Sequence, residues 1–285
     1  MESFQKILSQ NWKTLSYRSL SLTKDVYQLA KIRKINTPKT ILFIFGCQRS
    51  GTTLLTEIFQ RDFQNTKVYE EFSRLSSADK VHHIRLNPLH VVRAQIDHTR
   101  PPLVVLKPLV ESQNAVKLLK YFKNSKALWV YRHYRDVAIS NLEKWGSHNG
   151  INNLRPVVQA QTDNWRAEHV SEYSRTIVAK YFSDEMNPYD AAALFWFIRN
   201  RLFFEMHLEK NRNVLSCKYE DLIDNPARII RNIYKFVGYN YPADKIPMKI
   251  YADSKGRGRN IQLSPEIDTL CNDMLAKLDL THRVT

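Results

Sequence analysis

The chain contains little glycine, little cysteine and no long hydrophobic run. Seven glycines and three cysteines occur among its 285 residues. The densest apolar run, Ala191 to Ile198, is far shorter than the roughly 20 residues that span a bilayer. The first residues, Met1 to Ile7, lack the apolar core of a signal peptide. These absences argue against a membrane-spanning helix, and we expect a protein of the reducing cytoplasm.

The cysteines and several histidines show no spacing that is typical of a metal site or a disulfide framework. The cysteines, an odd set without a CxxC pair, are Cys47, Cys217 and Cys271. The histidines, which lack the i, i+4 pairing of HExxH, are His82, His83, His90 and His98. We therefore expect no metal, surface positions for these histidines, and for Cys47 a small buried spacer rather than a reactive thiol.

Acidic residues are few relative to basic ones. The chain has 43 lysines and arginines against 28 aspartates and glutamates, which gives a formal charge of +15 and a pI near 9.7. This excess favours an anionic partner, but it does not choose among phosphorylated nucleotides, acidic glycans, nucleic acids and anionic membranes. The length and the hydrophobic fraction of 43% are ordinary for a globular protein.

The composition divides the chain into a basic N-terminal arm, residues 1–38, and one domain, residues 39–285. Cations of the arm include Lys24, Lys31, Arg33 and Lys34. Apolar residues at amphipathic-helix spacing are Leu22, Val26, Leu29 and Ile32. This stripe is narrow, which favours a helix that packs on its own domain, although peripheral contact with anionic lipid stays open.

Predicted strands alternate with predicted helices along the domain. The strands are expected at residues 41–45, 103–107, 127–132 and 213–219. The helices are expected at residues 54–59, 135–145, 188–207, from 226 onward and at 265–278. This alternation predicts an α/β fold with a parallel sheet and right-handed crossovers. The aromatic residues of 188–207 are expected in the core.

A glycine loop joins the first strand to the first helix of the domain. Gly46-x4-Gly51-Thr52-Thr53 has the glycine spacing of a nucleotide-triphosphate loop, but Thr52 replaces the lysine and the cation is Arg49. Backbone N–H groups and the following helix N-terminus can still bind an anion there.

Two further segments carry cations that suit a second phosphate. Arg132 ends a predicted strand, and Ser140 lies on the next predicted helix. The carboxyl end of a strand is where ligands of open α/β sheets bind, and an arginine fork with a hydroxyl fits a phosphate. Further on, Gly256 and Gly258 alternate with basic residues in Lys255-Gly-Arg-Gly-Arg259.

Together these segments resemble the sulfotransferases that use 3′-phosphoadenosine 5′-phosphosulfate (PAPS). Gln48-Arg-Ser-Gly-Thr-Thr53 is similar to their 5′-phosphosulfate loop, and Arg132 with Ser140, in Arg-x3-Asp-x3-Ser, to their 3′-phosphate motif. Lys218-Tyr-Glu-Asp-Leu222 resembles a strand end that places Tyr219 near the adenine. Lys255-Gly256 resembles the C-terminal segment that closes on the 3′-phosphate.

The resemblance covers roughly residues 41 to 260 and implies a single three-layer α/β domain with a P-loop-like phosphosulfate-binding loop. It implies PAPS as the donor, adenosine 3′,5′-diphosphate as the product, and no metal. The residues it assigns to the cofactor are Gln48, Arg49, Ser50, Gly51, Thr52, Thr53, Arg132, Ser140, Tyr219, Lys255 and Gly256.

Departures from the cytosolic phenol-type members indicate which branch is nearer. Arg49 stands in place of their loop lysine, Leu54 in place of a tryptophan, and Tyr134 in place of a proline. Glu70-Glu71, about twenty residues after the loop, is instead similar to bacterial and Golgi-type enzymes whose base is a glutamate. The resemblance therefore implies a carbohydrate or other polar acceptor with a hydroxyl or amine.

The implied reaction is in-line sulfuryl transfer, in which positioning and electrostatics dominate by analogy with phosphoryl transfer. Arg49, the loop amides and the loop threonines would hold the phosphosulfate, and Lys107 a sulfuryl oxygen. Glu71, or failing that Glu70, would take the proton of the acceptor.

Two other functions stay open on the sequence alone. A P-loop small-molecule kinase would share the glycine spacing, but persuasive magnesium ligands and a loop lysine are missing from the sequence. A non-enzymatic polyanion-binding protein would explain the charge, although no helix-turn-helix, zinc-finger or RNP signature is present, and we expect no nucleic acid partner.

Overall fold

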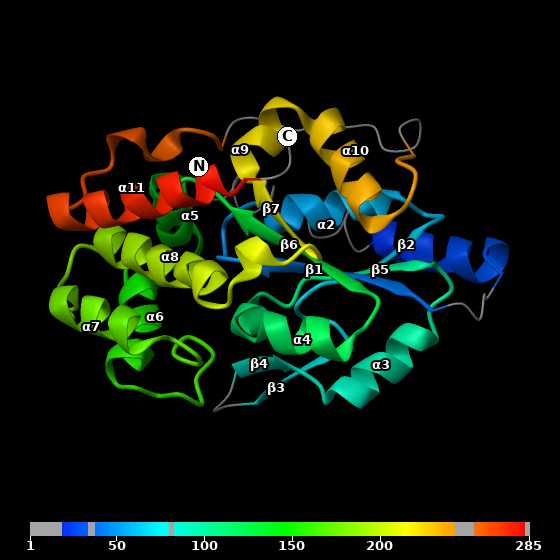
Figure 1. Cartoon of the computed structure of the whole chain (residues 1–285), viewed down its shortest axis with the longest axis horizontal. Coiled ribbons are helices and arrows are strands. Elements are labelled where there is room, and N and C mark those ends of the chain that lie inside the picture. Colours follow the sequence, from blue (N-terminus) through cyan, green and yellow to red (C-terminus); the bar gives the residue numbers. More distant parts are fainter. Residues whose placement is uncertain (1–18, 34–37, 80–82, 243–253, 283–285) are drawn as a thin grey trace.

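A five-stranded parallel sheet lies at the centre of the computed structural model, which describes residues 19–33, 38–79, 83–242 and 254–282 (Figure 1). The strands in spatial order are β2 (Thr66–Tyr69), β5 (Leu103–Leu106), β1 (Thr40–Gly46), β6 (Ser125–Tyr131) and β7 (Val214–Lys218). Every pairing in this sheet is parallel, with Ile41 of β1 opposite Val104 of β5 and Ser125 of β6. The predicted α/β class and parallel sheet are confirmed.

The sequence predicted four of these strands and did not assign β2. Three of the predicted strands, β1, β5 and β6, contain continuous apolar runs, as expected for strands that are buried on both faces. Strand β2 is as short as β5, but its sequence Thr-Lys-Val-Tyr contains no continuous apolar run, and it lies at the edge of the sheet.

Helices cover both faces of the sheet (Figure 1). Those whose apolar residues join the core on one face are α2 (Thr52–Arg61) and α10 (Pro226–Val237), preceded by the short α9 (Tyr219–Asp224). Those on the other face include α4 (Ala115–Tyr121), α5 (Tyr134–Trp145), α8 (Pro188–Glu205) and α11 (Pro265–Leu280). The three-layer arrangement is therefore confirmed.

Smaller elements complete the second face. They are the hairpin of β3 (Ser76–Asp79) and β4 (His83–Leu86), the helices α3 (Leu89–Asp97), α6 (Asn149–Val158) and α7 (Glu172–Tyr181), and the 3₁₀ turns η1 (Leu109–Asn114), η2 (Leu208–Lys210) and η4 (Arg257–Asn260). No helix among the described residues combines the length and apolar character needed to cross a bilayer.

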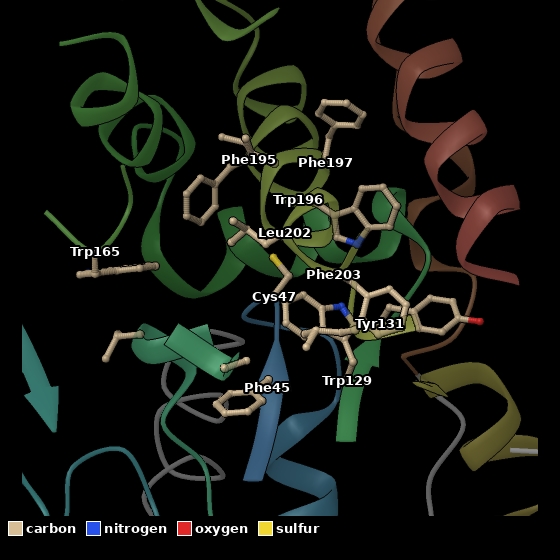
Figure 2. Close-up of a cluster of buried hydrophobic side chains, with 14 of the residues drawn as sticks. Phe45, Cys47, Trp129, Tyr131, Trp165, Phe195, Trp196, Phe197, Leu202 and Phe203 are labelled. Carbon is tan, nitrogen blue, oxygen red and sulfur yellow. The ribbon is translucent and has the colours of Figure 1, made fainter. Parts of the chain in front are cut away.

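The core between the sheet and α8 is rich in aromatic side chains (Figure 2). The rings of Trp129 on β6 and Phe203 on α8 lie 5.5 Å apart between centroids. Trp196 of α8 is fully buried and donates its indole N–H to the carbonyl oxygen of Arg132 over 3.0 Å. The aromatic residues of α8 are core residues, as predicted, and one of them also fixes the backbone where β6 ends.

The N-terminal helix, residues 19–31, packs on the domain through its polar face. Lys24 is fully buried and donates to the carbonyl oxygen of Phe59 over 2.9 Å and to Thr66 Oγ1 over 2.8 Å. Gln28 donates to the carbonyl oxygens of Phe63 and Thr66. The N-terminal helix therefore packs on the domain.

The apolar stripe of this helix faces outward, contrary to the usual role of such a stripe. Leu22, Val26 and Leu29 are 68%, 66% and 65% exposed. The physical reason is that the carbonyl oxygens of Phe59, in the last turn of α2, and of Phe63, just after it, accept hydrogen bonds from Lys24 and Gln28 on the polar face of this helix. Lys34, another cation of the predicted arm, lies outside the described residues.

We predict that Lys24 makes the stability of the protein depend on pH. Burial lowers the pKa of Lys24 from its ordinary value of 10.5 to about 7, so between these values the unfolded chain binds one proton more than the folded chain. The free energy of unfolding, relative to Lys24→Met, should rise with pH across this window by up to about 1.4 kcal/mol per pH unit.

Urea denaturation at several pH values measures this difference. Lys31→Met, at an exposed lysine of the same helix, is the matched control and should show no such dependence. A difference between wild type and Lys24→Met that stays constant with pH would contradict the prediction.

Candidate functional site

The loop between β1 and α2 presents backbone N–H groups to an open space. Arg49 and Gly51 adopt the left-handed region with φ of 68° and 90°. Gly51 is the N-cap of α2, and no side chain caps the helix, so its first N–H groups are available to an anion. The buried atoms Ser50 Oγ and Gln48 Oε1 have no hydrogen-bond partner within the described part of the chain.

Gly51 is required because the ring of Tyr219 lies against it. A Cβ atom at Gly51 would lie 2.1 Å from Tyr219 Cδ2, far inside contact distance. Tyr219 begins α9 directly after β7, as the strand end predicted from the sequence implied. The loop and the end of β7, far apart in sequence, therefore form one wall.

A cavity of about 390 Å³ opens above this wall. The residues assigned to the cofactor from the sequence that line it are Arg49, Gly51, Thr52, Thr53, Arg132, Ser140 and Tyr219. These residues come from β1, β6, β7 and the helices that follow them, because the carboxyl ends of parallel strands meet at one edge of the sheet.

Arg49 is held over the cavity by two contacts. Its Nε donates to Ser140 Oγ over 3.0 Å, and its guanidinium lies 5.5 Å from the ring centroid of Trp145. Burial, and after it the nearby charge of Arg132, lowers the pKa of Arg49. Two cations at one cavity repel each other, so an anion between them would relieve the repulsion.

Arg132 directly follows β6, and its guanidinium lies 4.5 Å from the ring centroid of Tyr219. It donates to Asp136 Oδ2 over 3.3 Å and to the carbonyl oxygens of Arg49 and Ser254. Its Nε is buried without a hydrogen-bond partner among the described residues. A buried arginine N–H beside a cavity is suited to a ligand oxygen.

Asp136 is a site residue to which sequence reasoning gave no role. This carboxylate is 3% exposed and accepts hydrogen bonds from the backbone N–H groups of Gly256 and Gly258, each over 2.8 Å. Its position four residues after Arg132 on a helix start was the available signal. Asp136 thus attaches the C-terminal segment to the end of β6.

The C-terminal segment enters the cavity through residues other than those expected. Ser254 and Arg257 line the cavity, whereas Lys255 pairs with Asp224 over 2.6 Å. Lys255 and Gly256 instead line a neighbouring cavity of about 330 Å³. The structure does not bring these two residues together with the loop, and their assignment to the cofactor stays a prediction.

Lys107 and Glu70 lie together beside the loop. Lys107 Nζ is 3.2 Å from Thr53 Oγ1 and forms an ion pair with Glu70. The hydroxyl of Thr56 also donates to Glu70. The carboxylate of Glu70 is therefore engaged by Lys107 and Thr56, while Lys107 is held next to the start of α2.

Glu71, the next residue, lines a second cavity of about 430 Å³. Its carboxylate accepts the N–H of Val110 over 3.0 Å. Burial raises the pKa of Glu71 above its ordinary value, and this hydrogen bond and Lys107 oppose the shift. A carboxylate with a raised pKa, facing a cavity, is a candidate general base.

The two cavities meet at the loop. Gln48 and Trp145 line the second cavity, and the next loop residue, Arg49, lines the first and lies over the ring of Trp145. Glu70, in contrast, lines a third cavity beside the N-terminal helix. Of the two glutamates considered from the sequence, Glu71 shares a cavity with the loop.

The cysteines and histidines take the positions expected of them where the structure describes them. Cys47 directly follows β1 and belongs to the core cluster of Figure 2, and burial raises the pKa of its thiol to about 12. His90 and His98 are exposed, while His82 lies outside the described residues. No group of three or more His, Cys, Asp or Glu among the described residues could hold a metal ion.

Comparison with known proteins identifies the family and the fold. The sequence profile of a family described as "Sulfotransferase domain" matches residues 39–254. No curated protein sequence matches the chain.

Two solved sulfotransferase domains have the same fold, and a third solved sulfotransferase is reported beside them. The domain from the Synechococcus PCC 7002 olefin synthase superposes with a TM-score of 0.53 at 14% identity, over 87% of this chain and 98% of its own. The domain from the curacin biosynthetic pathway superposes with a TM-score of 0.50 at 14% identity, over 89% of this chain and 100% of its own. The sulfotransferase from Alicyclobacillus acidocaldarius superposes with a TM-score of 0.49 at 14% identity, over 87% of this chain and 97% of its own.

We predict that Gly51→Ala removes ligand binding in the first cavity and that Gly238→Ala does not. Both glycines have φ near +90°, where alanine costs about 1–2 kcal/mol. A Cβ at Gly238 meets nothing within 4 Å, whereas at Gly51 it displaces Tyr219, with an overpacking cost of about 1–3 kcal/mol more.

Chemical denaturation and calorimetry with adenosine 3′,5′-diphosphate measure the two effects. Equal stability and equal affinity of the two variants would show that the contact between Gly51 and Tyr219 has no role.

Proposed function

The chain belongs to the sulfotransferase domain family, and from this premise we propose that it transfers a sulfuryl group from PAPS to a hydroxyl or amine of a polar acceptor. The observation that carries the proposal is the meeting of two unlike cavities at one loop. The first is lined by Arg49 and Arg132, and the second contains the carboxylate of Glu71. An anionic donor requires cations such as those of the first cavity, and an acceptor that releases a proton requires a base such as the carboxylate in the second.

The first cavity suits the donor. The loop N–H groups, the start of α2 and Arg49 would hold the 5′-phosphosulfate. Arg132 and Ser140 would hold the 3′-phosphate, with Arg257 close by at the rim of the same cavity. Tyr219 would lie near the adenine. The buried Nε of Arg132, which has no partner among the described residues, supports the assignment.

The second cavity suits the acceptor. In the proposed step, the acceptor oxygen attacks sulfur and its proton passes to Glu71, while the bond between sulfur and the bridging phosphate oxygen breaks and that oxygen keeps the electron pair. Arg49 stabilises the charge on this leaving group. Lys107, held by Glu70, faces the charge that spreads over the sulfuryl oxygens.

The lining of the second cavity supports a polar acceptor. It combines the indole rings of Trp145 and Trp165 with the carboxamides of Asn141, Asn149 and Asn153. Flat amphipathic rings and hydrogen-bonding groups together fit a carbohydrate or another polyhydroxylated molecule better than a small hydrophobic one.

Calorimetric titration tests the donor and separates it from the kinase alternative. We expect adenosine 3′,5′-diphosphate to bind tightly with and without magnesium, and ATP to bind weakly, because the cavity offers arginines for a 3′-phosphate. Magnesium-dependent binding of ATP with indifference to the 3′-phosphate would favour a kinase. Binding of neither nucleotide, with strongly salt-dependent affinity for generic DNA, would favour a polyanion-binding protein.

Two arginine variants accompany this titration. Arg132→Ala should weaken binding of the diphosphate by about 1.5–3 kcal/mol, the value of a charge-assisted hydrogen bond. Arg155→Ala is the matched control, since Arg155 pairs with Asp184 on the surface of α6. Unchanged affinity in Arg132→Ala would remove Arg132 from the site.

We predict that Glu71→Gln lowers turnover of PAPS with polar acceptors by about 10²–10⁴-fold, the usual contribution of a general base. Binding of adenosine 3′,5′-diphosphate should stay unchanged, because Glu71 does not line the first cavity. Since the pKa of Glu71 is raised, wild-type activity should fall as pH falls through that pKa, and the variant should lack this dependence.

Glu70→Gln serves as the comparison. It removes the ion-pair partner of Lys107 without touching the second cavity, so its turnover should be reduced while the pH dependence assigned to Glu71 remains. Full turnover in Glu71→Gln, with the pH dependence lost in Glu70→Gln, would reverse the two roles.

A further inference from the structure

Arg166 is a cation of the second cavity that has no carboxylate partner among the described residues. Its Nε donates to Asn153 Oδ1 over 2.6 Å, and Nη1 lies 3.5 Å from Asn164 Oδ1. Its guanidinium lies 4.6 Å from the ring centroid of Trp165. None of the ion pairs formed by the described residues includes Arg166. Most of its fork of N–H donors therefore remains available.

The nearest acidic residue in the sequence is committed elsewhere. Glu168 accepts hydrogen bonds from Arg85 and from Gln113, each over 2.8 Å, and from Asn114 over 3.2 Å. These bonds hold its carboxylate in a partly buried network beside η1. Glu168 is thereby saturated by other donors, and the charge of Arg166 is left without compensation.

Partial burial of an uncompensated cation is costly. Burial lowers the pKa of Arg166, and no acid in the described part of the chain opposes the shift. Asn153 and Trp165 hold the guanidinium in one orientation all the same. An arginine that is oriented but lacks a counter-charge is suited to an anion that arrives with a ligand.

Arg166 and Glu71 occupy different parts of this cavity. The carboxylate of Glu71 accepts the N–H of Val110, whereas the guanidinium of Arg166 donates to Asn153 on α6. Both residues nevertheless line the same space of about 430 Å³, and 85% of Phe72 is exposed at its edge. One acceptor molecule could therefore present its reacting hydroxyl to Glu71 and a second group to Arg166.

We propose that Arg166 binds an oxyanionic group of the acceptor, so that the preferred acceptor is itself an anion. A carboxylate, a phosphate or a sulfate would match the planar fork of the guanidinium, and Trp165 would keep that fork in place. This inference rests on the proposed function, because it takes the second cavity to be the acceptor site.

The test compares two glycosides that differ in one carboxylate. 4-Nitrophenyl β-D-glucuronide and 4-nitrophenyl β-D-glucoside are titrated by calorimetry into the full chain at about 0.15 M salt, with and without saturating adenosine 3′,5′-diphosphate. We expect the wild type to bind the glucuronide at least about tenfold more tightly than the glucoside, as one charge-assisted contact would give.

Variants assign the preference to one residue. Arg166→Gln should reduce it to less than about twofold through loss of glucuronide affinity, with glucoside affinity unchanged. Arg166→Lys should retain part of it, because the charge remains and the fork is lost. Arg155→Gln, on α6 and outside the cavity, lowers the net charge equally and should keep the full preference.

The outcomes separate this inference from the proposed function. Three results would overturn the proposal that Arg166 binds an anionic acceptor. They are equal affinity of the wild type for both glycosides, no detectable binding of the glucuronide, and a preference for the glucuronide that persists in Arg166→Gln. If the wild type does not bind adenosine 3′,5′-diphosphate, the proposal that PAPS is the donor is overturned, whatever the affinities for the two glycosides.

Discussion

The buried carboxylate of Asp136 makes the contacts on which the first cavity depends. It accepts two backbone N–H groups of the C-terminal segment and the guanidinium of Arg132. Removing a carboxylate from water is costly, and three charge-matched or polar donors are what make its burial possible. The two hydrogen bonds to Asp136 hold the turn that carries Gly256 and Gly258. In this position Ser254 and Arg257, on the same segment, line the cavity. A segment more than 100 residues away thus completes the site through one side chain.

The parallel sheet explains why residues from distant segments converge. Strands β1, β2, β5, β6 and β7 all point the same way, so the residues that follow them lie along one edge. That edge carries the glycine loop, Glu71, Lys107, Arg132 and Tyr219. The core supports this arrangement, since Trp196 binds the carbonyl group of Arg132 and the Gly51 backbone packs against Tyr219.

Part of the net charge of +15 is concentrated at the two cavities. Arg49, Arg132 and Lys107 surround the position proposed for the sulfuryl donor, and Arg166 lies in the adjoining cavity. Only part of this charge is compensated internally. Lys107 is paired with Glu70 and Arg132 with Asp136, whereas Arg166 has no acidic partner among the described residues. A donor and an acceptor that both carry negative charge would supply the compensation.

The sequence by itself determined the fold class, the loop and the strand-end residues Arg132 and Tyr219, because these follow from local patterns. Apolar runs specify buried strands, and glycine spacing specifies a turn. The tertiary structure alone decided which of two adjacent glutamates faces the loop cavity, because both follow the end of β2 and their directions are set by contacts with other segments, Glu70 with Lys107 and Glu71 with the N–H of Val110. It also turned Lys24 inward, directed Lys255 to Asp224 and placed Arg166 in a cavity. Each of these depends on a contact between segments far apart in the chain, and spacing along the sequence carries no information about such contacts.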